Sequence, residues 1–142
     1  MYKCKYFTIQ ELVSPNILKV LSEANCWRRL KTGALKDLDL IRESWGKPIY
    51  INGNHFGLSY TNSGWRHPKT SVGADWSVHK LADSFDLKDS EGNHQGLWDH
   101  IHYMIITGQL KYFNTMERKD KTPTWVHLAN MNTDEKPLIV IP

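Results

Sequence analysis

The fold of this chain is decided by residues 77–86, which read Ser-Val-His-Lys-Leu-Ala-Asp-Ser-Phe-Asp. His79 precedes a short segment with two small residues, and Asp86 lies on a strand-like segment between two large apolar residues. A carboxylate with such neighbours needs a partner, because burying an unpaired charge is costly. A metal ion held by His79 and Asp86 would be that partner, and the small residues would let the chain turn close to it. The alternative is a structural hydrogen bond between the two side chains.

Seven histidines supply further candidate ligands. Zinc takes three or four nitrogen, oxygen or sulfur ligands, catalytic sites leave a position open for water, and imidazole and carboxylate both suit it. His127 lies in a late apolar segment and, taken by itself, is expected to be an ordinary strand histidine. His100 and His102 are the main competitors, but on a helix their side chains diverge by about 200°, so a surface role is expected. The other three lie in polar loops and are expected to be solvated, namely His55, His67 and His94. The alternative for two of them, His55 and His67, is that they line a substrate cleft.

Helices are expected in the N-terminal third of the chain. Thr8 and Glu11 have capping-box spacing, which predicts a short helical turn that ends before Pro15. A second helix is expected from Pro15 to about Asn25, with proline in its first turn. The third, over residues 31–45, has the clearest apolar periodicity and is closed by Gly46.

Strands dominate the rest of the chain. Short strands are expected at residues 49–51 and 85–87, and residues 97–107 are predicted to form a helix. Residues 110–116 and 124–130 are expected to pair as a hairpin, and the last apolar run, residues 138–141, is a candidate edge strand. Helices first and strands afterwards predict an α+β fold with a mostly antiparallel sheet. The length of 142 residues fits one domain, residues 1–142.

Composition narrows the classes of partner. The net charge is +3 without a long basic run, so nucleic-acid binding is not expected. Cys4 and Cys26 form no CxxC pair, which disfavours a thiolate zinc site, and two free thiols are favoured over a disulfide. No stretch is apolar enough for a signal peptide or a membrane span. We therefore expect synthesis in the cytoplasm, with no membrane partner.

The stretch 77–86 resembles the signature Ser-x-His-x-x-Gly-x-Ala-x-Asp of the M15 zinc metallopeptidases, with Ala82 and Ser84 in place of its glycine and alanine. This family includes the D-Ala-D-Ala carboxypeptidases and the phage endolysins that cut L-alanyl-D-glutamate bonds. The Trp-Val-His sequence that ends at His127 is similar to the context of the family's last ligand. The opening segment, residues 7–13, and the helix and strand around Gly46 also resemble the family in the right order.

The resemblance implies an M15 or hedgehog-like fold with zinc bound by His79, Asp86 and His127. Ser77 would contact substrate. Many members carry the general base three residues before the last ligand, where this chain has Thr124. We therefore expect Glu117, on the preceding strand, to be the base, ahead of Asp120 in the turn. The substrate-binding arginine that the family often places after the strand at residues 49–51 is missing there, since the next arginine is Arg66.

These features lead to the expectation of a monomeric zinc peptidase that cuts peptidoglycan stem peptides, of the phage endolysin kind. It would be held in the host cytoplasm and released to the cell wall by another factor. The alternative is a catalytically impaired module of the same fold that acts as a binding, virion or host-inhibitory protein.

Overall fold

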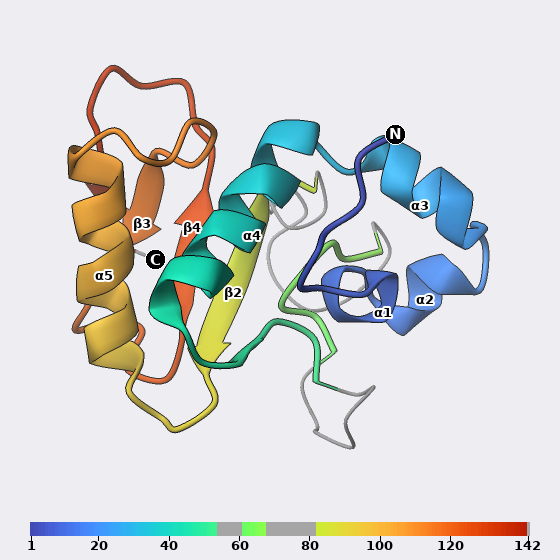
Figure 1. The fold of residues 1–142 in the computed structure, drawn as a ribbon, viewed down its shortest axis with the longest axis horizontal. Coiled ribbons are helices and arrows are strands. Elements are labelled where there is room, and N and C mark those ends of the chain that lie inside the picture. The colour runs from blue at the N-terminus through green and yellow to red at the C-terminus, as the bar shows by residue number, and fades with distance from the viewer. Residues whose placement is uncertain (54–60, 68–81, 142) are drawn as a thin grey trace.

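The structure, a computed structural model, describes residues 1–53, 61–67 and 82–141 (Figure 1). The helices of these residues are α1 (Ile9–Leu12), α2 (Pro15–Leu18), α3 (Glu23–Arg29), α4 (Thr32–Trp45) and α5 (His94–Ile106). The strands are β1 (Ile49–Tyr50), β2 (Ser84–Asp89), β3 (Thr115–Glu117), β4 (Val126–Ala129) and β5 (Leu138–Val140). None of these helices is long and apolar enough to cross a membrane.

The N-terminal helices follow their local signals except at one place. The predicted capping box forms, because Glu11 accepts hydrogen bonds from the Thr8 amide at 2.8 Å and from its hydroxyl at 3.0 Å. Helix α4 ends as predicted at Gly46, whose φ of 78° is a left-handed value that favours glycine. The prediction of a single helix from Pro15 to about Asn25 is wrong, because two helices, α2 and α3, lie there. The Ser22 hydroxyl accepts a hydrogen bond from an amide of the next turn and begins a separate helix, α3.

The five strands form one sheet in the order β1-β2-β4-β3-β5. Neighbouring strands are antiparallel except β3 and β5, which are parallel. The expectation of an α+β fold with a mostly antiparallel sheet is therefore confirmed, as are the hairpin of β3 with β4 and the edge strand β5.

The strand predicted over residues 110–116 is shorter than expected. Only its end joins the sheet as β3, because the amides of Lys111, Tyr112 and Phe113 donate to the Asp37 carboxylate of α4 at 2.8–3.1 Å. Backbone donors that bind a side chain cannot also bind a neighbouring strand.

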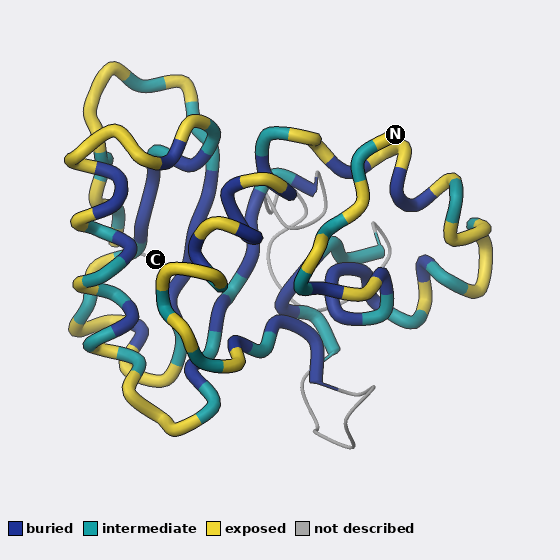
Figure 2. Tube along the Cα trace, in the orientation of Figure 1, coloured by how far each residue is buried: buried dark blue, intermediate teal, exposed yellow. Residues whose placement is uncertain are grey.

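The two faces of the sheet differ in what they carry. Helices α4 and α5 pack over one face (Figure 1). Alternate strand residues belong to the same buried cluster as these helices, namely Phe85, Leu87, Met116, Val126 and Leu128. Figure 2 shows the buried and exposed stretches alternating along both helices. Since successive strand residues point to opposite faces, the intervening residues of β2, β3 and β4 lie on the face away from the helices.

Candidate metal centre and active site

Asp86 and His127 lie next to each other on the face away from α4 and α5. They are partners in the antiparallel pairing of β2 with β4. The His127 Nδ1 atom is 2.8 Å from the Asp86 Oδ1 atom. Both side chains are largely buried, with 8% of the His127 side chain and 14% of the Asp86 side chain exposed. Two of the three predicted metal ligands are thus in direct contact, and together they offer the nitrogen and oxygen donors that zinc uses.

Glu117 extends this pair to a third strand. Thr115 and Met116 of β3 pair with Ala129 and Leu128 of β4, so the next step of the same register brings Glu117 opposite His127. Met116 is in the core, and Glu117 therefore lies on the opposite face with Asp86 and His127. The predicted base and two predicted ligands form one row across β2, β4 and β3.

Arg66 is a site residue that the sequence interpretation did not identify. Its Nη2 atom is 3.8 Å from the Asp86 Oδ2 atom, and 12% of its side chain is exposed. Burial lowers the pKa of Arg66, while the charges of Asp86 and Glu117 act in the opposite direction. Residues 61–67 therefore bring a largely buried cation to Asp86.

Asn52 brings the segment of Arg66 to the sheet. The fully buried Asn52 side chain accepts hydrogen bonds from the amides of Ser63 at 2.8 Å and Gly64 at 3.3 Å. The Ser63 carbonyl in turn accepts from the Asp86 amide at 2.7 Å. A Cβ atom on Gly64 would lie 2.2 Å from the Leu12 carbonyl oxygen, so only glycine allows this approach. No local spacing signals these tertiary contacts, which explains why the sequence alone did not identify Arg66.

Lys88 is a second cation on the same face, two residues beyond Asp86 on β2. Its ammonium nitrogen is 2.6 Å from the Ser63 hydroxyl oxygen. Burial lowers the pKa of Lys88 to about 8, the charge of Asp86 acts to raise it, and that of Arg66 lowers it further. The two cations are thus close enough to influence each other, and both influence Asp86.

The two positions where the chain departs from the M15 signature show local misfits. Ala82 has a φ of 61°, a left-handed value that favours glycine, which is the residue of the signature. Ser84 is fully buried, and its hydroxyl has no hydrogen-bond partner among the described residues. The alanine of the signature would leave no such hydroxyl. The backbone at position 82 therefore suits glycine, and the surroundings of position 84 suit a side chain without a hydroxyl.

The other predicted site residues stand as follows. Ser77 and His79 lie outside the described residues, as does His55. Thr124 is exposed. Within residues 1–53, 61–67 and 82–141, no group of three or more His, Cys, Asp or Glu side chains could hold a metal ion. The predicted ligand His79 lies outside these ranges.

The competing histidines of α5 diverge as expected. His100 Nε2 lies 2.8 Å from the Ser44 hydroxyl, and the His102 ring stacks on Trp98 with centroids 4.9 Å apart. They do not converge on one point. Asp83 is half-buried and accepts a hydrogen bond from the Tyr112 hydroxyl at 2.6 Å.

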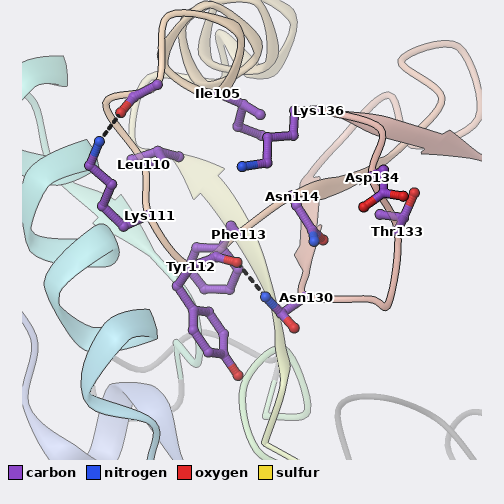
Figure 3. Close-up of a pocket in the computed structure, with 11 residues that line it drawn as sticks. Ile105, Leu110, Lys111, Tyr112, Phe113, Asn114, Asn130, Thr133, Asp134 and Lys136 are labelled. Carbon is purple, nitrogen blue, oxygen red and sulfur yellow. Dashed lines mark hydrogen bonds between the residues drawn. The ribbon is translucent and has the colours of Figure 1, made fainter.

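A cavity of about 590 Å³ lies away from this row, between the end of α5 and the segments around β3 and β4 (Figure 3). Several of its polar side chains are engaged with backbone groups. The Asn130 side chain donates to the Tyr112 carbonyl, and the Lys111 ammonium donates to the Gly108 carbonyl at 2.6 Å, as the dashed lines in Figure 3 show. The Asn114 side chain donates a hydrogen bond to the Met131 carbonyl and accepts one from the Met131 amide. These side chains hold loops together, and the row of Asp86, His127 and Glu117 remains the stronger candidate site.

Comparisons with known proteins give no match: no family model, no curated protein and no solved structure is significantly similar to this chain.

Proposed function

We propose that this protein is a zinc-dependent peptidase that cuts a peptide bond in bacterial peptidoglycan stem peptides, as the M15 endolysins do. The observation that carries the proposal is the row of Asp86, His127 and Glu117 on adjacent strands. The resemblance of the sequence to the M15 signature supports it. So do the left-handed backbone at Ala82 and the Ser84 hydroxyl, which has no partner in the part of the chain that the structure describes, since both arise where the chain departs from that signature.

Asp86 and His127 would bind the metal together with His79. The donor set fits zinc, and the second carboxylate oxygen of Asp86 faces the Arg66 cation, in the way that ligating carboxylates are commonly held by outer partners. Zinc bound there would supply Lewis-acid activation of a water molecule and of the scissile carbonyl. The alternative of a purely structural hydrogen bond between Asp86 and His127 predicts no stabilisation by added zinc.

Glu117 would act as the general base. It would accept a proton from the attacking water and deliver it to the nitrogen of the leaving amine. Its place in the row beside His127 suits this role better than the exposed position of Thr124 does. Arg66, on which the charges of both Asp86 and Glu117 act, would hold a carboxylate of the substrate near the bond.

The test is a digestion of purified peptidoglycan, with fragments identified by mass spectrometry, with and without a zinc chelator. We expect new free amines that disappear with the chelator, and a loss of about 10²–10⁴-fold in rate for Glu117→Gln with zinc binding retained. Glu135→Gln is the matched control, because Glu135 is exposed and lies outside the three strands that carry the row. Activity that survives in Glu117→Gln would exclude Glu117 as the base.

The same experiment separates the enzyme from a non-catalytic module. Protein that carries zinc, binds stem peptide and cleaves nothing would overturn the peptidase proposal and favour the binding, virion or host-inhibitory alternative. Protein that neither binds zinc nor gains thermal stability from it would overturn the metal site itself, since a ligand of the native state must stabilise that state.

A further inference from the structure

A cavity of about 440 Å³ lies at the C-terminal end of β2, next to the proposed active site. Its walls include Tyr50 of β1, Lys88 of β2, His94 at the start of α5 and Thr124 before β4. Tyr50 and Lys88 are partners in the pairing of β1 with β2. The cavity therefore lies beside the last residues of β1 and β2 and the first residues of α5 and β4. Its polar groups come from separate segments of the chain.

Lys88 connects this cavity to the catalytic row. Lys88 and Asp86 are two residues apart on β2, so both side chains lie on the face away from the helices, about 7 Å apart along the strand. Lys88 thus belongs both to the wall of the cavity and to the face on which a substrate would lie.

The position of the Lys88 ammonium is fixed by Ser63. The hydrogen bond of 2.6 Å to the Ser63 hydroxyl holds the ammonium group at the site. Ser63 is itself held by Asn52, through the same hydrogen bonds that position Arg66. One buried scaffold therefore holds two cations on one face, Arg66 beside Asp86 and the Lys88 ammonium at the Ser63 hydroxyl, with the Lys88 backbone two residues further along β2.

We propose that Lys88, with Tyr50 and Thr124, forms a subsite that binds a carboxylate of the substrate about two residues from the bond that is cut. This inference rests on the proposed peptidase function. It names a specificity determinant of that site: the enzyme would prefer stem peptides with a free carboxylate at that position over peptides in which the carboxylate is amidated.

The spacing supports a carboxylate at this distance. An extended peptide advances about 3.3–3.6 Å per residue, so two residues of substrate span the distance from Asp86 to Lys88 along the strand. Ammonium and hydroxyl groups are donors that suit a carboxylate, and a hydrogen bond between charged partners is stronger than one to a neutral amide. A carboxamide would lose that advantage.

The experiment compares two synthetic stem peptides that differ at one group, a carboxylate about two residues from the scissile bond, which is free in one peptide and amidated in the other. We expect wild-type protein loaded with zinc to have a kcat/KM about tenfold or more higher for the free carboxylate, mainly through KM. Lys88→Met should remove this preference by lowering activity on the free carboxylate alone. Lys88→Arg, which keeps the charge, should retain most of it, and Lys121→Met, at an exposed lysine, should behave as wild type.

The outcomes separate this inference from the proposed function. Cleavage with the same preference in wild type and Lys88→Met would overturn the subsite and leave the peptidase standing. If wild type cleaves neither peptide, the peptidase proposal fails, and calorimetric binding of the two peptides decides the subsite alone. Tighter binding of the free carboxylate that is lost in Lys88→Met would then support the subsite, and equal binding would overturn it. The retained preference of Lys88→Arg guards against a folding defect in the methionine variant.

Discussion

Replacing Ser84 by alanine should stabilise the protein, although most substitutions in a buried strand destabilise. The Ser84 hydroxyl is fully buried and has no partner among the described residues. A buried polar group without a hydrogen bond costs about 1–3 kcal/mol. Alanine keeps the Cβ atom and removes one oxygen, so little packing is lost. We expect a net gain of about 1 kcal/mol in the free energy of unfolding.

The assay is urea unfolding followed by tryptophan fluorescence and circular dichroism, with the change read from the midpoint at constant m. Ser22→Ala is the matched control, because the Ser22 hydroxyl caps α3 by accepting the Asn25 amide at 3.3 Å. That variant should lose about 0.5–2 kcal/mol. A loss of stability in Ser84→Ala comparable to that of Ser22→Ala would refute the reasoning, because it would mean that the Ser84 hydroxyl has a partner in solution.

Two further predictions concern buried carboxylates. Asp37→Asn should lower the free energy of unfolding by about 3 kcal/mol, since the carboxylate accepts hydrogen bonds from three backbone amides and asparagine offers one oxygen. The control, Asp120→Asn at an exposed ion pair, should change it by under about 0.5 kcal/mol. Equal effects of the two substitutions in urea unfolding would contradict this role of Asp37. Burial acts to raise the pKa of Asp89, but hydrogen bonds from the Trp45 indole and two backbone amides outweigh it and lower that pKa. Its stabilisation is therefore complete above the unfolded pKa of about 3.9 and is lost as the pH falls through the lower folded value. Asp89→Asn should be less stable than wild type at pH 7, and the difference should shrink as the pH falls below the unfolded pKa and through the lower folded pKa. Urea unfolding at a series of pH values measures this, and a difference that stays constant would contradict the sign.

Local signals predicted those parts of the fold that local interactions determine. The box of Thr8 and Glu11 and the left-handed Gly46 both depend on residues within one turn, so spacing alone identified them. The break before α3 was missed because the apolar stripe continues across Ser22. The shortening of the strand at residues 110–116 was missed for a different reason, since the competing acceptor, Asp37, is more than 70 residues away.

The candidate site was predictable in its residue types and not in its assembly. An acid flanked by core residues identified Asp86, and the resemblance of the Trp-Val-His sequence to the M15 family identified His127. Their contact depends on the register of β2 with β4, which the sequence does not state. Arg66 depends on Asn52 and on the close approach at Gly64, so no spacing rule measured along the chain from β1 could find it.

The charges of the described site explain why an anionic substrate suits the proposed enzyme. Arg66 and Lys88 are two cations, Asp86 and Glu117 are two carboxylates, and the opposite charges lie near each other on one face. These side chains are therefore balanced without a metal, which makes the face tolerable in a half-buried setting. A zinc ion adds two positive charges and upsets that balance. A substrate carboxylate beside Lys88 would offset part of the excess, whereas an amidated peptide would not, so metal binding and the preference for a free carboxylate should rise together. Affinity for the acidic peptide measured with and without zinc tests this coupling, because equal affinity in both conditions would show that the two sites act independently.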